Sequence, residues 1–148
     1  MSETIKPRTS ADHGYVLDAQ IGFLLRKAYQ RNSTIFLDLV PGKLTTTQFS
    51  IMHRLAEDGP MSQNLLGRSV AMDGATTKGV VDRLIARDLL ATRRDPQDRR
   101  RHLVSLTPRG VKLVDEAVEA AIRVTDETLA PLRDREKETL LRLLAKII

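Results

Sequence analysis

The densest chemical feature of this 148-residue sequence is a run of arginines interrupted by aspartates. The run contains Arg93, Arg94, Arg99, Arg100 and Arg101, together with Asp95 and Asp98. Protein stability does not explain such crowding, because like charges repel and exposed ion pairs contribute only about 0–1 kcal/mol. Arginine side chains are favoured in a narrow minor groove of DNA by the negative potential there. The run therefore indicates contact with a DNA duplex.

A second group of side chains suits the recognition of base edges. Ala75, Thr76, Thr77 and Lys78 stand at the start of a predicted helix. Threonine hydroxyls bond bases or phosphates, threonine methyls contact thymine, and a lysine ammonium reaches guanine acceptors. Sequence readout is predicted here, although a plain amphipathic helix with solvated threonines explains the same pattern. Phosphate contacts are also predicted at positions where a solvated side chain is nearly as good an explanation: Ser62, Gln63, Arg68 and Arg83.

The positive charge is concentrated around these two groups. The net charge is +5. Residues 60–114 hold eleven Lys and Arg against five Asp and Glu, which is +6. The preceding residues hold seven against six and the following residues six against eight, so the flanks are +1 and −2. A basic block between nearly neutral flanks is typical of a nucleic-acid-binding unit, although a solvated basic face would have the same composition.

Other residues that commonly carry chemistry are scarce. Cysteine is absent, so thiolate catalysis, disulfides and thiolate metal sites are excluded. His13, His53 and His102 are widely separated without ligand spacing, and no Gly-rich phosphate loop occurs. We therefore expect no enzyme, cofactor or metal site, with a metal-sensing regulator as a weak alternative. The polar N-terminus and the lack of a long apolar run predict a cytoplasmic protein that contacts no membrane.

Helices must position these groups. Apolar residues at three- and four-residue steps predict one long helix over His13–Leu39, ended by Pro41-Gly42. A second helix follows one of the threonines at 45–47 and stops at Asp58. The first helix carries more apolar residues than one small core can cover, which indicates that a second subunit covers the rest.

Two short helices and a hairpin follow. Ser62 and Asp73 are predicted N-caps of helices joined by a tight turn, which is the helix-turn-helix pattern. Strands are predicted over Leu90–Arg94 and His102–Leu106, with the arginine run at the tip between them. Thr107-Pro108 begins a helix that reaches about Leu129, and the last predicted helix covers Arg133–Ile148. The predicted class is mainly α with a small β-hairpin wing (α+β), containing six helices.

Three segments resemble the wing region of the MarR family of bacterial winged helix-turn-helix transcriptional regulators. They are LIARDLL at 84–90, RRDPQDRR at 93–100 and VSLTPRG at 104–110. The resemblance implies an intertwined homodimer, with a dimerisation region formed by 13–43 and 108–148 and a DNA-binding region at 44–107. It also implies that Asp98 orients Arg100 for minor-groove insertion. Strand alternation would then turn Arg99 and Arg101 to the opposite side, toward phosphates.

Two positions depart from that family pattern. Gly79 stands where many members carry arginine in the recognition helix, and Asp88 stands where a helix-ending glycine is usual. Glycine costs about 1 kcal/mol of helix propensity relative to alanine, so Gly79 predicts close approach to DNA or to a neighbouring helix. Asp88 is expected to adopt the left-handed conformation that ends a helix.

The resemblance also implies a ligand-responsive regulator, most often a repressor. Such a protein binds a palindromic operator and is released by a small aromatic or phenolic carboxylate, whose predicted pocket groups are Tyr15, Phe23, Arg26, Phe49 and His53. The two phenylalanines are better explained as core and His53 as a bonded polar group, whereas Arg26 pairs either with a ligand carboxylate or with an acidic neighbour. The alternative function is a non-specific architectural DNA-binding protein without an effector.

Overall fold

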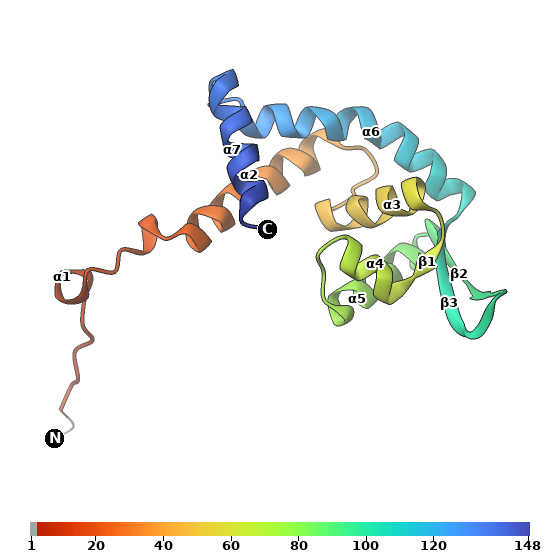
Figure 1. The fold of residues 1–148 in the computed structure, drawn as a ribbon, viewed down its shortest axis with the longest axis horizontal. Helices are drawn as coiled ribbons and strands as arrows, with labels where there is room; N and C mark the ends of the chain where they lie inside the picture. Colours follow the sequence, from red (N-terminus) through yellow and green to blue (C-terminus); the bar gives the residue numbers. More distant parts are fainter. Residues whose placement is uncertain (1–2) are drawn as a thin grey trace.

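The computed structural model describes residues 3–148 and is mainly helical, with one small sheet (Figure 1). Helices α2 and α6 run along one side of the molecule, α3 lies below them, and α4, α5 and the sheet form the opposite side. The elements are α1 (Ser10–His13), the 3-10 turn η1 (Leu17–Ala19), α2 (Ile21–Leu39), α3 (Thr46–Asp58), β1 (Met61–Ser62), α4 (Gln63–Ser69), α5 (Gly74–Ala86), β2 (Leu90–Asp95), β3 (Asp98–Leu106), α6 (Pro108–Leu129) and α7 (Asp134–Lys146).

The N-terminal helix is shorter than predicted. The expected helix from His13 begins only at Ile21, and the one-turn α1 and η1 precede it, in addition to the six helices predicted. Gly14 ends α1 in the left-handed region, with φ 74°, and Gln20 is extended, with ψ 135°. The apolar residues keep helical spacing through Gly14 and Gln20, but the backbone leaves the helical conformation at both residues.

Side-chain caps start four of the main helices at the residues that the sequence indicated. The hydroxyls of Thr45, Ser62 and Thr107 and the carboxylate of Asp73 each accept a hydrogen bond from the backbone N–H three residues later. Each contact satisfies one of the donors that a helix N-terminus leaves unpaired. These caps fix the residues at which α4 and α5 begin, and the N-termini of both helices belong to the candidate site.

The core lies between α3, α4, α5, α6 and the sheet. Its fully buried side chains include Leu44, Ile51, Met52, Leu66 and Leu84. Burying such a side chain stabilises the fold by about 1.5–3 kcal/mol. Aliphatic residues thus supply most of this core, as the low aromatic content of 3% predicts.

The sheet has three strands rather than the two expected. Its order is β1-β3-β2 and both pairings are antiparallel. In β1, Met61 pairs with Val104, and this two-residue strand is too short to give a sequence pattern. The pairing joins the beginning of α4 to the wing.

The turn between α5 and β2 is fastened to α6. Asp88 has φ 57°, as the sequence predicted, and its carbonyl accepts a 2.7 Å hydrogen bond from the Thr107 hydroxyl. Gly110 lies so close that a Cβ added there would stand 2.1 Å from the carbonyl oxygen of Leu89. Only glycine fits at this crossing, which anchors the first turn of α6 on the winged region.

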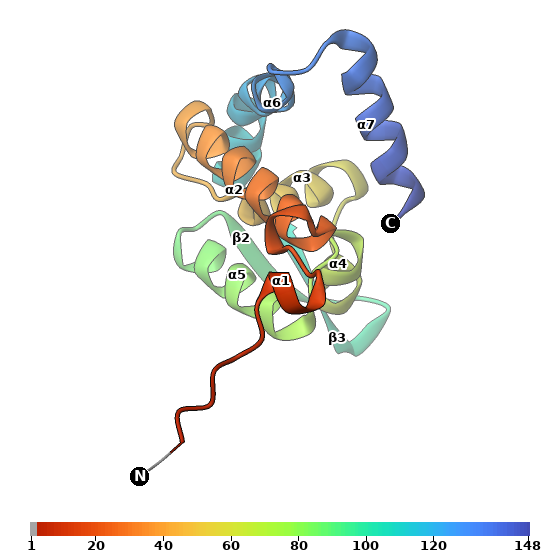
Figure 2. The ribbon, with the colours of Figure 1, turned by 90° about the vertical axis from the view of Figure 1, so that its left-hand side faces the viewer.

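Two helices keep apolar faces that nothing in the described chain covers. Ile21 on α2 is 62% exposed, and Leu141 and Leu143 on α7 are 50% and 47% exposed. No residue of α7 is buried, and the helix turns back from the end of α6 without joining the core (Figure 2). None of the helices over residues 3–148 combines the length and apolarity needed to cross a membrane.

Candidate nucleic-acid interface

Helices α4 and α5 form the helix-turn-helix unit. A Cβ added at Gly67 would stand 2.6 Å from the Thr77 hydroxyl, so glycine permits the close crossing of the two helices. The turn between them contains Ala71 at φ 57°, and the Met72 N–H donates to the Gly67 carbonyl at 2.9 Å. One face of α5 packs on the core, and the other side chains in the N-terminal half of this helix point outward.

The structure corrects one predicted DNA contact. Ala75, Thr76 and Lys78 are exposed, but Thr77 is fully buried, with 0% of its surface accessible. Its hydroxyl donates to the Asp73 carbonyl at 2.7 Å. The helical turn directs Thr77 into the α4–α5 crossing, so it packs the unit together and does not reach a groove.

The remaining polar groups of α5 are held in place by contacts within the helix. The Thr76 hydroxyl donates to Asp73 at 2.8 Å, and the Lys78 ammonium lies 2.8 Å from the Asp82 carboxylate. The Thr76 backbone N–H, followed by its hydroxyl, lowers the pKa of Asp73 below its ordinary value of 3.8. The Arg83 guanidinium donates weakly to the Gly79 carbonyl at 3.4 Å. Thr76 and Lys78 are therefore oriented before DNA arrives.

Gly79 lies in the middle of this exposed surface. A Cβ added there would meet only the end of the Arg83 side chain, at 3.4 Å. Within residues 3–148 no other element comes within 4 Å of that position, so the predicted close approach to a neighbouring helix of the same chain is wrong. Close approach to DNA is the interpretation that stays open.

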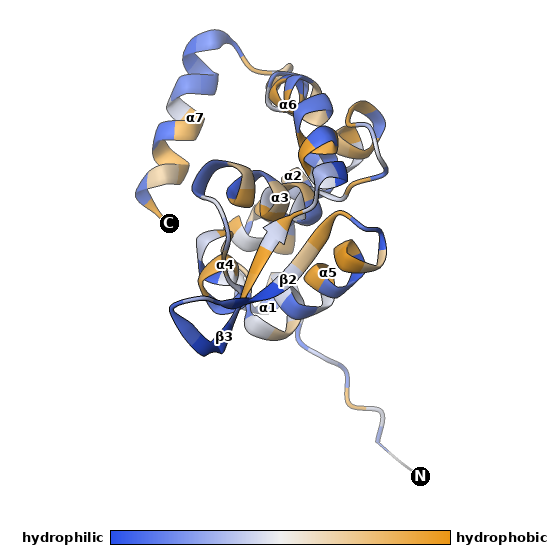
Figure 3. Cartoon of the chain, turned by 90° about the vertical axis from the view of Figure 1, so that its right-hand side faces the viewer, coloured by the Kyte–Doolittle hydropathy of each residue, from blue (hydrophilic) through white to orange (hydrophobic). Residues whose placement is uncertain are grey.

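All five arginines of the run are exposed, and Figure 3 shows that the tip of the wing is hydrophilic. The Arg100 backbone N–H donates to the Asp98 carboxylate at 3.0 Å, so Asp98 holds the backbone of Arg100 and not its guanidinium. The register of the hairpin shifts between Arg94 and Asp95. The register gives residues 99–101 no partner on β2, and Arg100 and Arg101 both line one hollow.

That hollow joins the wing to α4. It has a volume of about 550 Å³ and is lined by predicted residues from both elements: Ser62, Gln63, Arg68, Asp98, Arg100 and Arg101. His102 and Asn64 complete the lining, and the sequence analysis did not select either for this site. Arg93, in contrast, lies on β2, opposite Leu103. Folding thus brings groups 40 residues apart into one basic concavity beside α5.

Only part of the predicted effector pocket comes together within one chain. Phe49 and His53 line a second hollow of about 500 Å³ next to Arg68, with their ring centroids 5.7 Å apart. Phe49 also packs on the buried Phe36, with ring centroids 5.6 Å apart. Phe49 therefore belongs both to the core, through Phe36, and to the hollow, through His53.

The other three candidates lie elsewhere on the chain. Tyr15 and Arg26 are exposed, and Phe23 lies under the Lys27 ammonium at 5.6 Å. The sequence analysis missed Tyr29, whose hydroxyl bonds to Thr46 beside the Phe49 hollow. Tyr29 follows Arg26 by three residues on α2, and this helical spacing could have identified Tyr29 as a further candidate.

Comparisons with known proteins agree with this geometry. The MarR family model matches residues 44–102. The HTH-type transcriptional repressor NicR of Pseudomonas putida is 39% identical over 135 residues, covering 90% of this chain and 85% of NicR. The chain belongs to the MarR family. This MarR-family protein is therefore a transcriptional regulator with a DNA-binding winged helix fold, and its relatives are not enzymes.

Solved structures of similar regulators have the same fold. A probable transcriptional regulator from Pseudomonas aeruginosa is 48% identical, with a TM-score of 0.86, covering 90% of this chain and 100% of its own. BpsR of Bordetella bronchiseptica, whose DNA binding is regulated by 6-hydroxynicotinic acid, is 42% identical, with a TM-score of 0.82, covering 90% and 96%. The MarR-family fold thus extends over the terminal helices as well as the winged region.

Proposed function

We propose that this MarR-family protein is a repressor that binds a palindromic operator as a homodimer and is released by a small aromatic carboxylate. The observation that carries the proposal is the basic hollow formed by α4 and the wing, beside the exposed start of α5. A helix fits the major groove, and a flanking wing reaches the adjacent minor groove.

Each part of this surface has a separate task in the proposal. Ala75, Thr76 and Lys78 face base edges at the N-terminal half of α5, where a recognition helix approaches DNA most closely. Arg100 enters the minor groove from the wing. Phosphate contacts hold the register and come from the surrounding polar groups: Ser62, Gln63, Arg83, Arg93, Arg99 and Arg101.

The dimer in this proposal uses the chain ends, 13–43 and 108–148. The uncovered apolar faces of α2 and α7 support it, because exposed apolar surface of this extent marks an interface. Two copies would present two recognition helices to successive major grooves, about 34 Å apart. A palindromic operator follows from the twofold symmetry of such a dimer.

The hollow beside Phe49 and His53 is the proposed effector site. An aromatic ring can stack on Phe49, and the nearby Arg68 guanidinium suits a carboxylate. Regulation of the similar BpsR by 6-hydroxynicotinic acid supports an aromatic acid as the ligand class. A ligand that favours one spacing of the two recognition helices would shift the population away from the DNA-bound form.

Footprinting on the DNA upstream of the protein's own gene tests the proposal, with and without a panel of hydroxylated nicotinic and benzoic acids. We expect a protected palindrome, preferred over random duplex by about 10³-fold or more, and loss of protection with one class of acid. A His53→Ala variant, which changes the exposed side of the same hollow, should bind DNA normally and respond less to the acid. Equal binding to all duplexes would instead favour an architectural protein, and no release by any acid would contradict the effector.

A further inference from the structure

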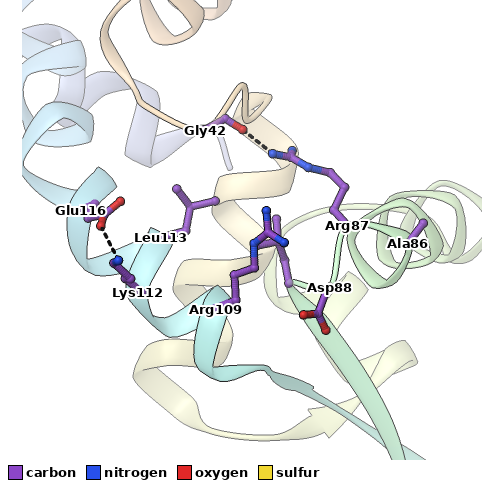
Figure 4. Close-up of a pocket in the computed structure, with 9 residues that line it drawn as sticks. Gly42, Ala86, Arg87, Asp88, Arg109, Lys112, Leu113 and Glu116 are labelled. Atoms are coloured by element: carbon purple, nitrogen blue, oxygen red, sulfur yellow. Dashed lines mark hydrogen bonds and ion pairs between the residues drawn. The ribbon is translucent and has the colours of Figure 1, made fainter.

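A third cavity lies away from both of these hollows, where the α2–α3 loop, the end of α5 and the start of α6 meet (Figure 4). Its volume is about 530 Å³. It shares no lining residue with the basic hollow of the wing or with the hollow of Phe49. Its polar lining consists of Gly42, Arg87, Asp88, Arg109, Lys112 and Glu116.

The two arginines of this cavity have no carboxylate partner. Among residues 3–148, no acidic oxygen lies within 4.0 Å of Arg87 or Arg109, whereas Lys112 pairs with Glu116 at 3.9 Å. Figure 4 shows the carboxylate of Asp88 turned away from the two guanidinium groups. Two positive charges thus face the same space without compensation by the protein.

The fold adds to the positive potential of this cavity. Arg109 and Lys112 stand in the first turns of the 22-residue helix α6, which has no acidic residue in its first turn. Cations near a helix N-terminus oppose the helix dipole and reduce stability. Arg87 and Arg109, unlike Lys112, have no carboxylate to neutralise them, and two such charges at one cavity suit a ligand of opposite charge.

We propose that this cavity binds a small anion with at least two negative charges, carried by phosphate or carboxylate groups. The planar guanidinium groups of Arg87 and Arg109 match such oxygens in bidentate geometry. The Arg87 guanidinium donates to the Gly42 carbonyl, so a bound anion competes with that carbonyl for it. The site is therefore separate from the aromatic effector site and contacts both the α2–α3 loop and the end of α5.

Calorimetric titration of the full-length protein, without DNA, tests this site. Inorganic pyrophosphate and citrate are the two probes, and they distinguish a phosphate ligand from a carboxylate ligand. We expect one of them to bind saturably, at one ion per chain. Arg109→Gln should weaken that binding about tenfold or more, because a charge-assisted hydrogen bond is lost. Amide resonances of Gly42 should shift on binding.

An arginine from the wing supplies the matched control, because pyrophosphate resembles a DNA phosphate. Arg100→Ala should leave the anion affinity unchanged. The proposal is overturned if neither probe binds, or if Arg100→Ala abolishes binding while Arg109→Gln retains it. Melting curves establish that both variants fold. Since DNA is absent from the titration, its result is independent of whether the protein is a ligand-released repressor.

Discussion

Arg100 is positioned through its backbone, which Asp98 holds, so its guanidinium stays free to enter a groove. We expect Arg100→Ala to weaken operator binding by about 1–3 kcal/mol while the oligomeric state is unchanged. The slope of log affinity against log salt concentration should also decrease by about the contribution of one phosphate contact.

Binding isotherms over a salt series, with size-exclusion chromatography, measure both effects. Arg100→Lys is the matched control, because it keeps the charge and loses the planar fork; it should preserve the salt slope and lose part of the affinity. An Arg100→Ala protein with unchanged operator affinity at fixed salt would contradict the role given to this side chain.

A substitution at Gly79 tests stability and DNA contact independently. Gly79→Ala should stabilise the chain by about 0.5–1 kcal/mol, because α5 gains helix propensity and the added Cβ meets only the flexible end of Arg83. If the DNA backbone approaches closely here, the same variant binds the operator more weakly. Denaturant unfolding and operator titration give the two values, and unchanged operator affinity would rule out a close approach.

At the scale of elements, the start of α5 depends on an ionised cap. Hydrogen bonds from Thr76 hold the pKa of Asp73 below 3.8, so the folded chain favours the carboxylate more than the unfolded chain does. The resulting stabilisation is present above the ordinary pKa and is lost as the pH falls through the depressed value.

Asp73→Asn isolates this contribution, since asparagine also caps a helix but does not titrate. Between about pH 5 and pH 3, the wild-type protein should lose more stability than the Asp73→Asn variant. Thermal unfolding across this pH range provides the comparison. All other carboxylates titrate in both proteins, so parallel stability profiles would mean that the cap is not strengthened by its charge.

At the scale of the whole molecule, the uncovered faces of α2 and α7 govern assembly. Leu24 is 47% exposed and Leu141 is 50% exposed. A Leu24→Glu, Leu141→Glu double variant should be monomeric with unchanged helix content, because neither side chain is buried in the core. Operator affinity should fall by roughly 10²-fold or more, since one module reaches only one half-site.

Light scattering, circular dichroism and operator titration measure the three properties. Leu65→Glu on α4 is the control for assembly, because Leu65 is comparably exposed, at 48%, but lies outside both faces. It should leave the dimer intact. A double variant that stays dimeric would move the interface to another part of the chain.

Local chemistry allowed much of this protein to be predicted from its sequence. Caps at Ser62, Asp73 and Thr107, the left-handed Asp88 and the arginine hairpin depend on neighbours within a few residues, so residue type and spacing were enough. The family followed from the same local segments.

Tertiary structure decided what depends on distant contacts. The burial of Thr77 requires the crossing with Gly67, and β1 exists only because β3 pairs with it. The joining of Ser62 with Arg101, and of Gly42 with Arg87, spans about 40 residues of chain. Periodicity identifies which face of a helix is apolar, but only packing determines which element covers that face and which side chains meet in a cavity.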